Sequence, residues 1–144
     1  MNTLRTIMKN KDSTEVWSVA PQQSVLEAVT LMARLGIGAL LVMEGEELVG
    51  IVSERDYARK IILKGRRSET TPVAEIMTAG VQTATPGMTA QHCLGMMTEG
   101  HFRHLPVIED GKVMGVVSIG DLVKCVIADQ QVVIEELERY VTGG

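Results

Sequence analysis

The sequence contains a direct internal repeat, and no other feature limits the possible folds as strongly. Residues 16–62 align with residues 81–127 without a gap, and the identical pairs include Pro21/Pro86, Gly50/Gly115 and Asp56/Asp121. A duplication of this length is typical of two modules related by a pseudo-twofold axis, which leaves a shared cleft with two equivalent faces. We therefore expect the function to lie between the two halves.

Length and composition narrow the class of protein. The chain has 144 residues, and each half alone would bury only a marginal core, so we expect the halves to form one cooperative body. The net charge of −4 argues against nucleic acid or an anionic membrane as the main partner. No apolar run approaches membrane-spanning length, and we expect no signal peptide, because residues 1–13 lack the apolar core of one. The two cysteines are too few for a disulfide framework, which favours a reduced, cytoplasmic location.

Each half predicts the same order of elements: strand, helix, strand, strand, helix. This pattern indicates an α/β fold, with small α+β layers in each half. In the first half we expect strands at 16–20, 39–43 and 48–52, one helix from Ser24 to Gly36, and another from Ser53 to about residue 63. In the second half we expect strands at 81–85, 104–108 and 113–117, a helix after Thr89, and a final helix after Ser118. Asp110-Gly111 predicts a tight hairpin turn.

The segments outside the aligned repeats also echo each other. Leu4–Met8 and Val73–Met77 both end in Ile-Met, and each predicts a short lead-in helix. With the polar linker at 64–71, we divide the chain into a first repeat at 1–65 and a second at 66–144. The final helix keeps an apolar stripe beyond the repeat, which is explained equally well by docking on its own body and by a dimer contact.

Both halves contain the motif Gly-apolar-Val-Ser-x-x-Asp, at residues 50–56 and 115–121. In each copy the serine follows a strand and begins a helix, where its hydroxyl and the first backbone N–H groups can hold a phosphate. The aspartate, one helical turn further on, can accept both hydroxyls of a ribose. The alternative is a capping box, which stabilises the helix without any ligand.

The repeat order, the motif and the spacing together resemble a pair of CBS domains, also called a Bateman module, of the stand-alone two-repeat type. The resemblance covers essentially the whole chain. It implies two pseudo-symmetric β-α-β-β-α repeats packed sheet to sheet. It also implies regulatory binding of an adenine nucleotide such as AMP, ATP or NAD, in two clefts between the repeats and without turnover.

Carried over to this sequence, the resemblance implies two sets of ligand-binding residues. One cleft would combine Ser53, Asp56, Val81, Phe102, Arg103 and His104. The other would combine Ser118, Asp121, Thr14, Val16, Ile37, Gly38 and Ala39. Arg55 and Arg103 add positive charge to the first cleft, whereas Gly120 and Gly38 stand at the matching positions of the second. We therefore expect the first cleft to prefer phosphorylated ligands.

The predicted function is signal transduction: nucleotide occupancy changes the shape of the module or the geometry of a homodimer, and this change regulates a partner enzyme. An alternative is a dimeric interaction protein that modulates a partner, such as a redox enzyme, and has vestigial nucleotide pockets. Neither a catalytic residue nor a catalytic cofactor is expected, because no acid–base pair or activated nucleophile can be assembled from the spacing. His92, His101, His104, Cys93 and Cys125 lack zinc-ligand spacing, so no metal site is expected.

Overall fold

The computed structural model describes residues 2–10 and 16–142. These residues form two compact units. Residues 16–82 form the first-repeat unit, and residues 2–10 with 83–142 form the second-repeat unit. Each unit combines a small β-sheet with helices, which confirms the predicted α/β class. The division of the chain into a first repeat at 1–65 and a second at 66–144 stays a prediction.

The first-repeat unit contains a three-stranded sheet in the order β1 (Ser18–Val19), β2 (Ala39–Glu44), β3 (Glu47–Ser53). β1 is parallel to β2, and β2 is antiparallel to β3. Helix α2 (Val25–Leu35) begins as predicted, because the Ser24 hydroxyl accepts the N–H of Glu27, and it ends at Gly36 in the left-handed region with φ 68°. Its buried face, with Ala28 and Met32, packs into the same core as Val42 and Val52 of the sheet.

The helix predicted from Ser53 to about residue 63 is present, but only its first turn is α-helical. α3 spans Glu54–Tyr57, and residues Ala58–Ile62 continue as a π-helical turn. The N–H of Leu63 accordingly donates to the carbonyl of Ala58. Such wider turns are rare and occur most often as short insertions within helices.

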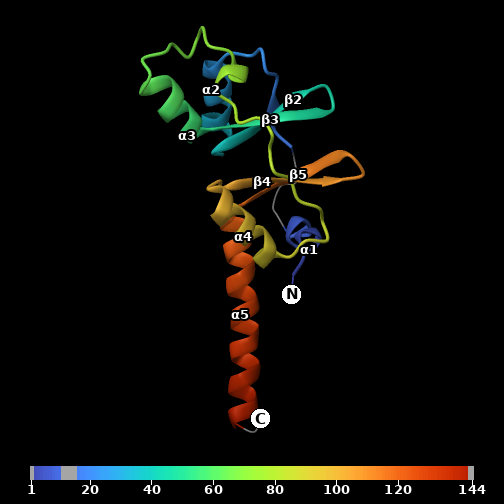
Figure 1. Ribbon diagram of the computed structural model, residues 1–144. Coiled ribbons are helices and arrows are strands. Elements are labelled where there is room, and N and C mark those ends of the chain that lie inside the picture. The colour runs from blue at the N-terminus through green and yellow to red at the C-terminus, as the bar shows by residue number, and fades with distance from the viewer. Residues whose placement is uncertain (1, 11–15, 143–144) are drawn as a thin grey trace. The chain divides into compact units, whose positions relative to one another are not determined.

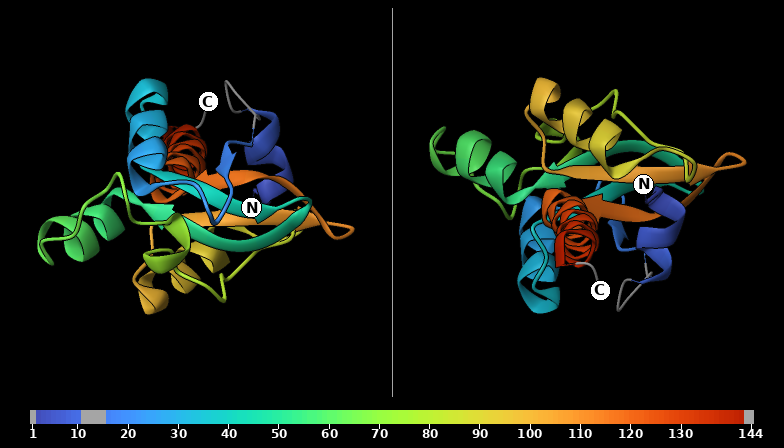
Figure 2. Two further views of the ribbon diagram at one scale, coloured as in Figure 1. Left: turned by 90° about the horizontal axis from the view of Figure 1, so that it is seen from above. Right: turned by 90° about the horizontal axis from the view of Figure 1, so that it is seen from below.

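The second-repeat unit contains the antiparallel hairpin of β4 (His104–Glu109) and β5 (Lys112–Ser118). Both turn residues have positive φ, 54° at Asp110 and 77° at Gly111, which confirms the predicted tight turn. Helices α1 (Leu4–Lys9), α4 (Ala90–Gly100) and α5 (Ile119–Thr142) lie on one face of this hairpin (Figure 1). Figure 2 looks nearly along the axis of α5 and shows α1 beside it.

The predicted strand at 81–85 is wrong, and Pro106 gives the physical reason. In the first repeat, the N–H of Leu41 donates to the carbonyl of Trp17 and joins β1 to β2. Pro106 is the counterpart of Leu41 in the aligned second repeat, and proline has no N–H to donate. The segment therefore keeps one parallel bridge, between Ala84 and Val107.

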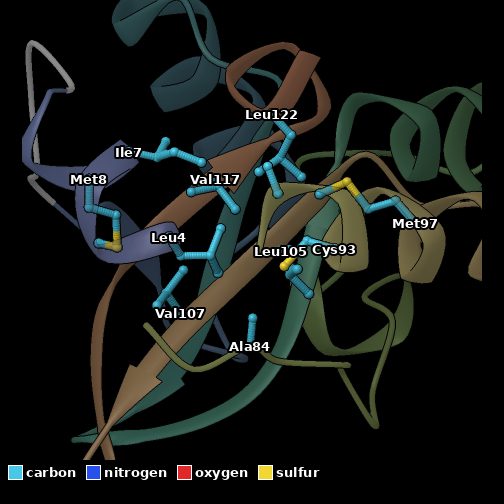
Figure 3. Packing of buried hydrophobic residues seen from close by; sticks show 11 residues of the cluster. Leu4, Ile7, Met8, Ala84, Cys93, Met97, Leu105, Val107, Val117 and Leu122 are labelled. Atoms are coloured by element: carbon cyan, nitrogen blue, oxygen red, sulfur yellow. The ribbon is translucent and has the colours of Figure 1, made fainter. Parts of the chain in front are cut away.

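The two lead-in segments pack into different cores. Helix α1, predicted from Leu4–Met8, places Leu4, Ile7 and Met8 in the second-repeat core (Figure 3), and the N–H of Leu4 donates to the carbonyl of Met88. The other predicted lead-in helix is a short 3₁₀ helix at Val73–Glu75. Its residues Val73 and Ile76 are fully buried in the first-repeat core. Each core is therefore completed by the chain segment that precedes the other repeat.

The two cysteines are not in a disulfide bond and differ in solvent exposure. Cys93 lies in the apolar cluster of Figure 3, where burial raises the pKa of its thiol, whereas Cys125 is partly exposed. Because the thiolate is the reactive form, we expect a maleimide at neutral pH to modify Cys125 well before Cys93 in the folded protein. A time course of peptide masses measures the two rates, with the urea-unfolded chain as the control in which the rates converge. Equal rates in the folded protein would contradict this assignment.

Candidate functional site

The first Ser-x-x-Asp motif forms a complete capping box where β3 meets α3. The N–H of Asp56 donates to Ser53 Oγ at 3.2 Å, and the N–H of Ser53 donates to Asp56 Oδ2 at 2.9 Å. The Ser53 hydroxyl also donates to Asp56 Oδ2, at 3.1 Å. The capping interpretation of this motif is therefore confirmed, and any ligand must bind alongside these bonds or replace them.

Lys60 is the charged residue of this site that the sequence analysis missed. Its Nζ lies 3.1 Å from Asp56 Oδ1 and donates to the carbonyl of Ile76 at 2.8 Å. The Asp56 side chain is 13% exposed and the Lys60 side chain 43%, so the carboxylate is sheltered while the cation stays open to solvent. The i,i+4 spacing of Asp56 and Lys60 places both on one helix face and could have indicated the pair. Lys60 thus ties the motif to the lead-in segment of the same unit.

The second motif repeats the two capping bonds between its serine and its aspartate. The N–H of Ser118 donates to Asp121 Oδ2 at 2.8 Å, and the N–H of Asp121 donates to Ser118 Oγ at 3.1 Å. The counterpart of Lys60 in the aligned second repeat is Cys125, whose sulfur accepts a bond from Asn2 Nδ2 at 3.3 Å. At these matched helix positions Lys60 donates to Ile76 of one lead-in segment, whereas Cys125 accepts from Asn2, which precedes the other.

Three backbone N–H groups of each Ser-x-x-Asp motif, those of its first, second and fourth residues, have partners within their own unit. The N–H of Glu54 donates to the carbonyl of Gly38 at 3.0 Å, and the N–H of Ile119 donates to the carbonyl of Arg103 at 2.9 Å. In each motif the N–H groups of the serine and the aspartate are engaged as well, in the two capping bonds. We therefore expect the side chains around the motifs to contribute more to ligand binding than these backbone N–H groups.

Most of the remaining predicted residues of the first-repeat unit lie beside the Ser53 motif. Ala39, at the start of β2, pairs in register with Ser53, and Ile37 and Gly38 precede it along the chain. Arg55 is partly buried in α3. Val16 and Val81, near the two ends of the unit, are also partly buried, and Thr14 lies outside the described residues.

The second-repeat unit gathers the predicted residues of β4 beside the Ser118 motif. His104 pairs in register with Ser118 and is partly buried, whereas Arg103 is exposed. Phe102 packs against the apolar core, which gives it a structural role. Each unit thus brings a strand entry together with the motif of its own repeat. The predicted combination of each motif with the strand entry of the other repeat stays a prediction.

Two other classes of site are absent from residues 2–10 and 16–142. Within these ranges, His, Cys, Asp and Glu side chains do not gather into a group of three that could hold a metal ion. Among the same residues, no helix is both long and apolar enough to cross a membrane.

Comparison with known proteins identifies the repeated unit. The family model of the CBS domain matches the chain twice, at residues 5–63 and 73–128. A solved structure of a protein with CBS domains from Burkholderia ambifaria MC40-6 is 49% identical, with a TM-score of 0.86 over 90% of this chain and 96% of that one. The CBS domain-containing protein CBSX3, mitochondrial, of Arabidopsis thaliana is 38% identical over 99% of this chain and 73% of its own length.

A third solved structure shares the fold at lower sequence identity. A CBS domain pair solved in complex with 5′-methylthioadenosine and S-adenosyl-L-methionine is 23% identical to this chain. Its TM-score is 0.78, over 90% of this chain and 98% of that one.

Proposed function

Because this chain belongs to the CBS-domain family and carries two CBS domains in tandem, we propose that it is a regulatory module that binds an adenine nucleotide without turning it over. AMP, ATP and NAD are the candidate ligands. Occupancy would favour one arrangement of the two repeats, and in a homodimer one arrangement of the subunits, by population shift. The proposed readout is altered activity of a partner enzyme in the cytoplasm.

The observation that carries this proposal is the duplicated Ser–Asp pair at the junction of a strand and a helix. In each pair the serine hydroxyl accepts the N–H of the aspartate, and the aspartate carboxylate accepts the N–H of the serine, so the hydroxyl and the carboxylate lie close together. A carboxylate at such a position can accept the two hydroxyls of a ribose, as acidic residues do in other nucleotide sites. The adenosine compounds in the complex of the CBS pair described above support this class of ligand.

The charges around the two motifs support different ligand preferences. Arg55 and Lys60 lie in the helical segment that carries Asp56, and Lys60 contacts the Asp56 carboxylate directly. Gly120 and Cys125 occupy the matching positions near Asp121. At these two matched positions only the first motif has cations. With Arg103 assigned to the first cleft, as the family resemblance implies, we propose that phosphorylated nucleotides bind there in preference. A ribose at Asp56 would compete with Lys60 for Oδ1.

Asp56→Asn is expected to weaken nucleotide binding about tenfold or more, because the amide cannot accept two ribose hydroxyls as the carboxylate does. Isothermal titration with AMP, ATP and NAD measures the affinity, and Asp121→Asn is the matched variant for the second motif. Thermal unfolding without ligand reports the loss of the cap separately, at about 1 kcal/mol. Absence of heat and of thermal shift with all three nucleotides would contradict the proposal, as would a loss of stability with unchanged affinity.

A further inference from the structure

Helix α5 continues far beyond the body of its own unit (Figure 1). It spans 24 residues, of which Leu122 is buried, and every residue from Gln130 to Thr142 is exposed. A single exposed helix of this length is only marginally stable in water, because most helical stability in proteins comes from packing an apolar face. The apolar residues that this segment exposes therefore call for a covering partner.

Half of these apolar residues, Ile134, Leu137 and Val141, continue a heptad repeat that begins earlier in α5, whereas Val132, Val133 and Tyr140 lie outside it. Counting alternately four and three residues along α5 selects a seam of six positions: Val123, Ile127, Gln130, Ile134, Leu137 and Val141. The exposed fraction is 60% for Ile127, 59% for Leu137 and 80% for Val141. In heptad notation the a positions are Ile127, Ile134 and Val141, all β-branched, and Leu137 is a d position. This combination favours a parallel two-stranded coiled coil.

We propose that a second copy of this chain covers the seam, through parallel pairing of the two α5 helices. Gln130 supports this occupant, because it is the one polar residue of the seam and occupies a d position. In a parallel homodimer Gln130 meets its own counterpart, and the two amides can donate to and accept from each other. In coiled coils a single polar residue in the seam, chiefly Asn or Lys at an a position, specifies register and strand number, and we assign the same role to Gln130 at its d position.

The charges of α5 are compatible with self-association. The acidic residues Glu135 and Glu136 lie at outer b and c positions, away from the seam. The flanking g and e′ positions of a parallel pair bring together Val126 with Gln131 and Val133 with Glu138, so two carboxylates never face each other there. An anionic membrane is disfavoured as the occupant, because Asp129, Glu135, Glu136 and Glu138 outnumber Arg139 in this part of the helix.

The homodimer is part of the proposed function, and this inference assigns it a surface and an orientation. The test uses the full chain without nucleotide, so its outcome is independent of nucleotide binding. Ile134→Glu places a charge in the seam, whereas Val132→Glu adds the same charge at an outer f position. The two sites are similarly exposed, at 46% and 54%, so neither change removes buried packing.

Sedimentation equilibrium is expected to show a dimer for the wild type and for Val132→Glu. The dimer dissociation constant of Ile134→Glu is expected to rise about 100-fold or more, because the dimer would bury two facing carboxylates. Circular dichroism checks that both variants remain folded. A monomeric wild type, or an equal dimer affinity in the two variants, would overturn the proposal.

Cysteine cross-linking tests the orientation. In a parallel pair, residue 134 of one helix faces residue 134 of the other, so Ile134→Cys is expected to form a disulfide-linked dimer under mild oxidation. Val132→Cys is the matched control and is expected to remain largely uncross-linked. Peptide mapping separates the new bond from any involving Cys93 or Cys125. Failure of Ile134→Cys to link in a dimeric protein would overturn the parallel arrangement.

Discussion

Leu4→Ala is expected to lower the free energy of unfolding by about 3 kcal/mol, although Leu4 lies at the start of the chain. Its side chain is fully buried among α4, α5 and the β4–β5 hairpin (Figure 3). Truncation removes apolar contacts and leaves a cavity that the packed neighbours fill only in part. Urea denaturation followed by circular dichroism measures the change.

The matched control for this prediction is Leu63→Ala. Leu63 is 77% exposed and lies outside both apolar cores, so its truncation is expected to cost less than about 0.5 kcal/mol. If Leu4→Ala were as mild as Leu63→Ala, α1 would contribute little to the second-repeat core in solution. The described packing of the lead-in would then be wrong.

Gly50→Ala is expected to destabilise the protein by about 2 kcal/mol, because the added methyl group has no room. A Cβ at this position would lie 2.6 Å from Met77 Sδ and 3.0 Å from the carbonyl oxygen of Thr78. The carbonyl oxygen belongs to a backbone that is fixed to β3, since Ile51 and Thr78 exchange two N–H···O bonds. The lead-in would have to move away from the strand.

Gly115→Ala provides the comparison from the equivalent position of the second repeat. Its Cβ would lie 2.6 Å from Met8 Cε, which is the end of a flexible side chain. The methionine can rotate away, so we expect a loss of less than about 1 kcal/mol. Thermal unfolding of the two variants side by side measures the difference. Equal losses would contradict the assignment of the Gly50 effect to the Thr78 backbone.

Local signals in the sequence predicted the local structure well. The helix caps at Ser24, Thr89, Ser53 and Ser118 are all formed, since each depends on residues no more than three positions apart. The Asp110-Gly111 turn is equally local. The predicted strand at 81–85 is wrong because a strand needs a neighbouring strand whose N–H groups can donate to it. The residue at the donating position is Pro106, which has no N–H and lies beyond α4 in the sequence.

The partners of the lead-in segments were beyond the reach of sequence patterns. Helical periodicity marks Leu4, Ile7 and Met8 as one apolar face, but it does not identify the core that buries this face. Lys60 was missed for a related reason. Its bond to the carbonyl of Ile76 depends on where the second lead-in folds back. The candidate site was therefore predictable in its Ser–Asp pairs and only partly in its charged surroundings.

The crossed placement of the lead-in segments has a consequence for any fragment of this chain. A truncated chain that ends between the repeats would keep α1 but lose the second-repeat core into which α1 packs, and it would lack Val73 and Ile76 from its own core. Such an isolated half could bury its apolar surface fully only by trading segments with another molecule. In the intact protein the covalent connection holds both lead-in segments at a high effective concentration, so neither core needs a second molecule to supply its lead-in.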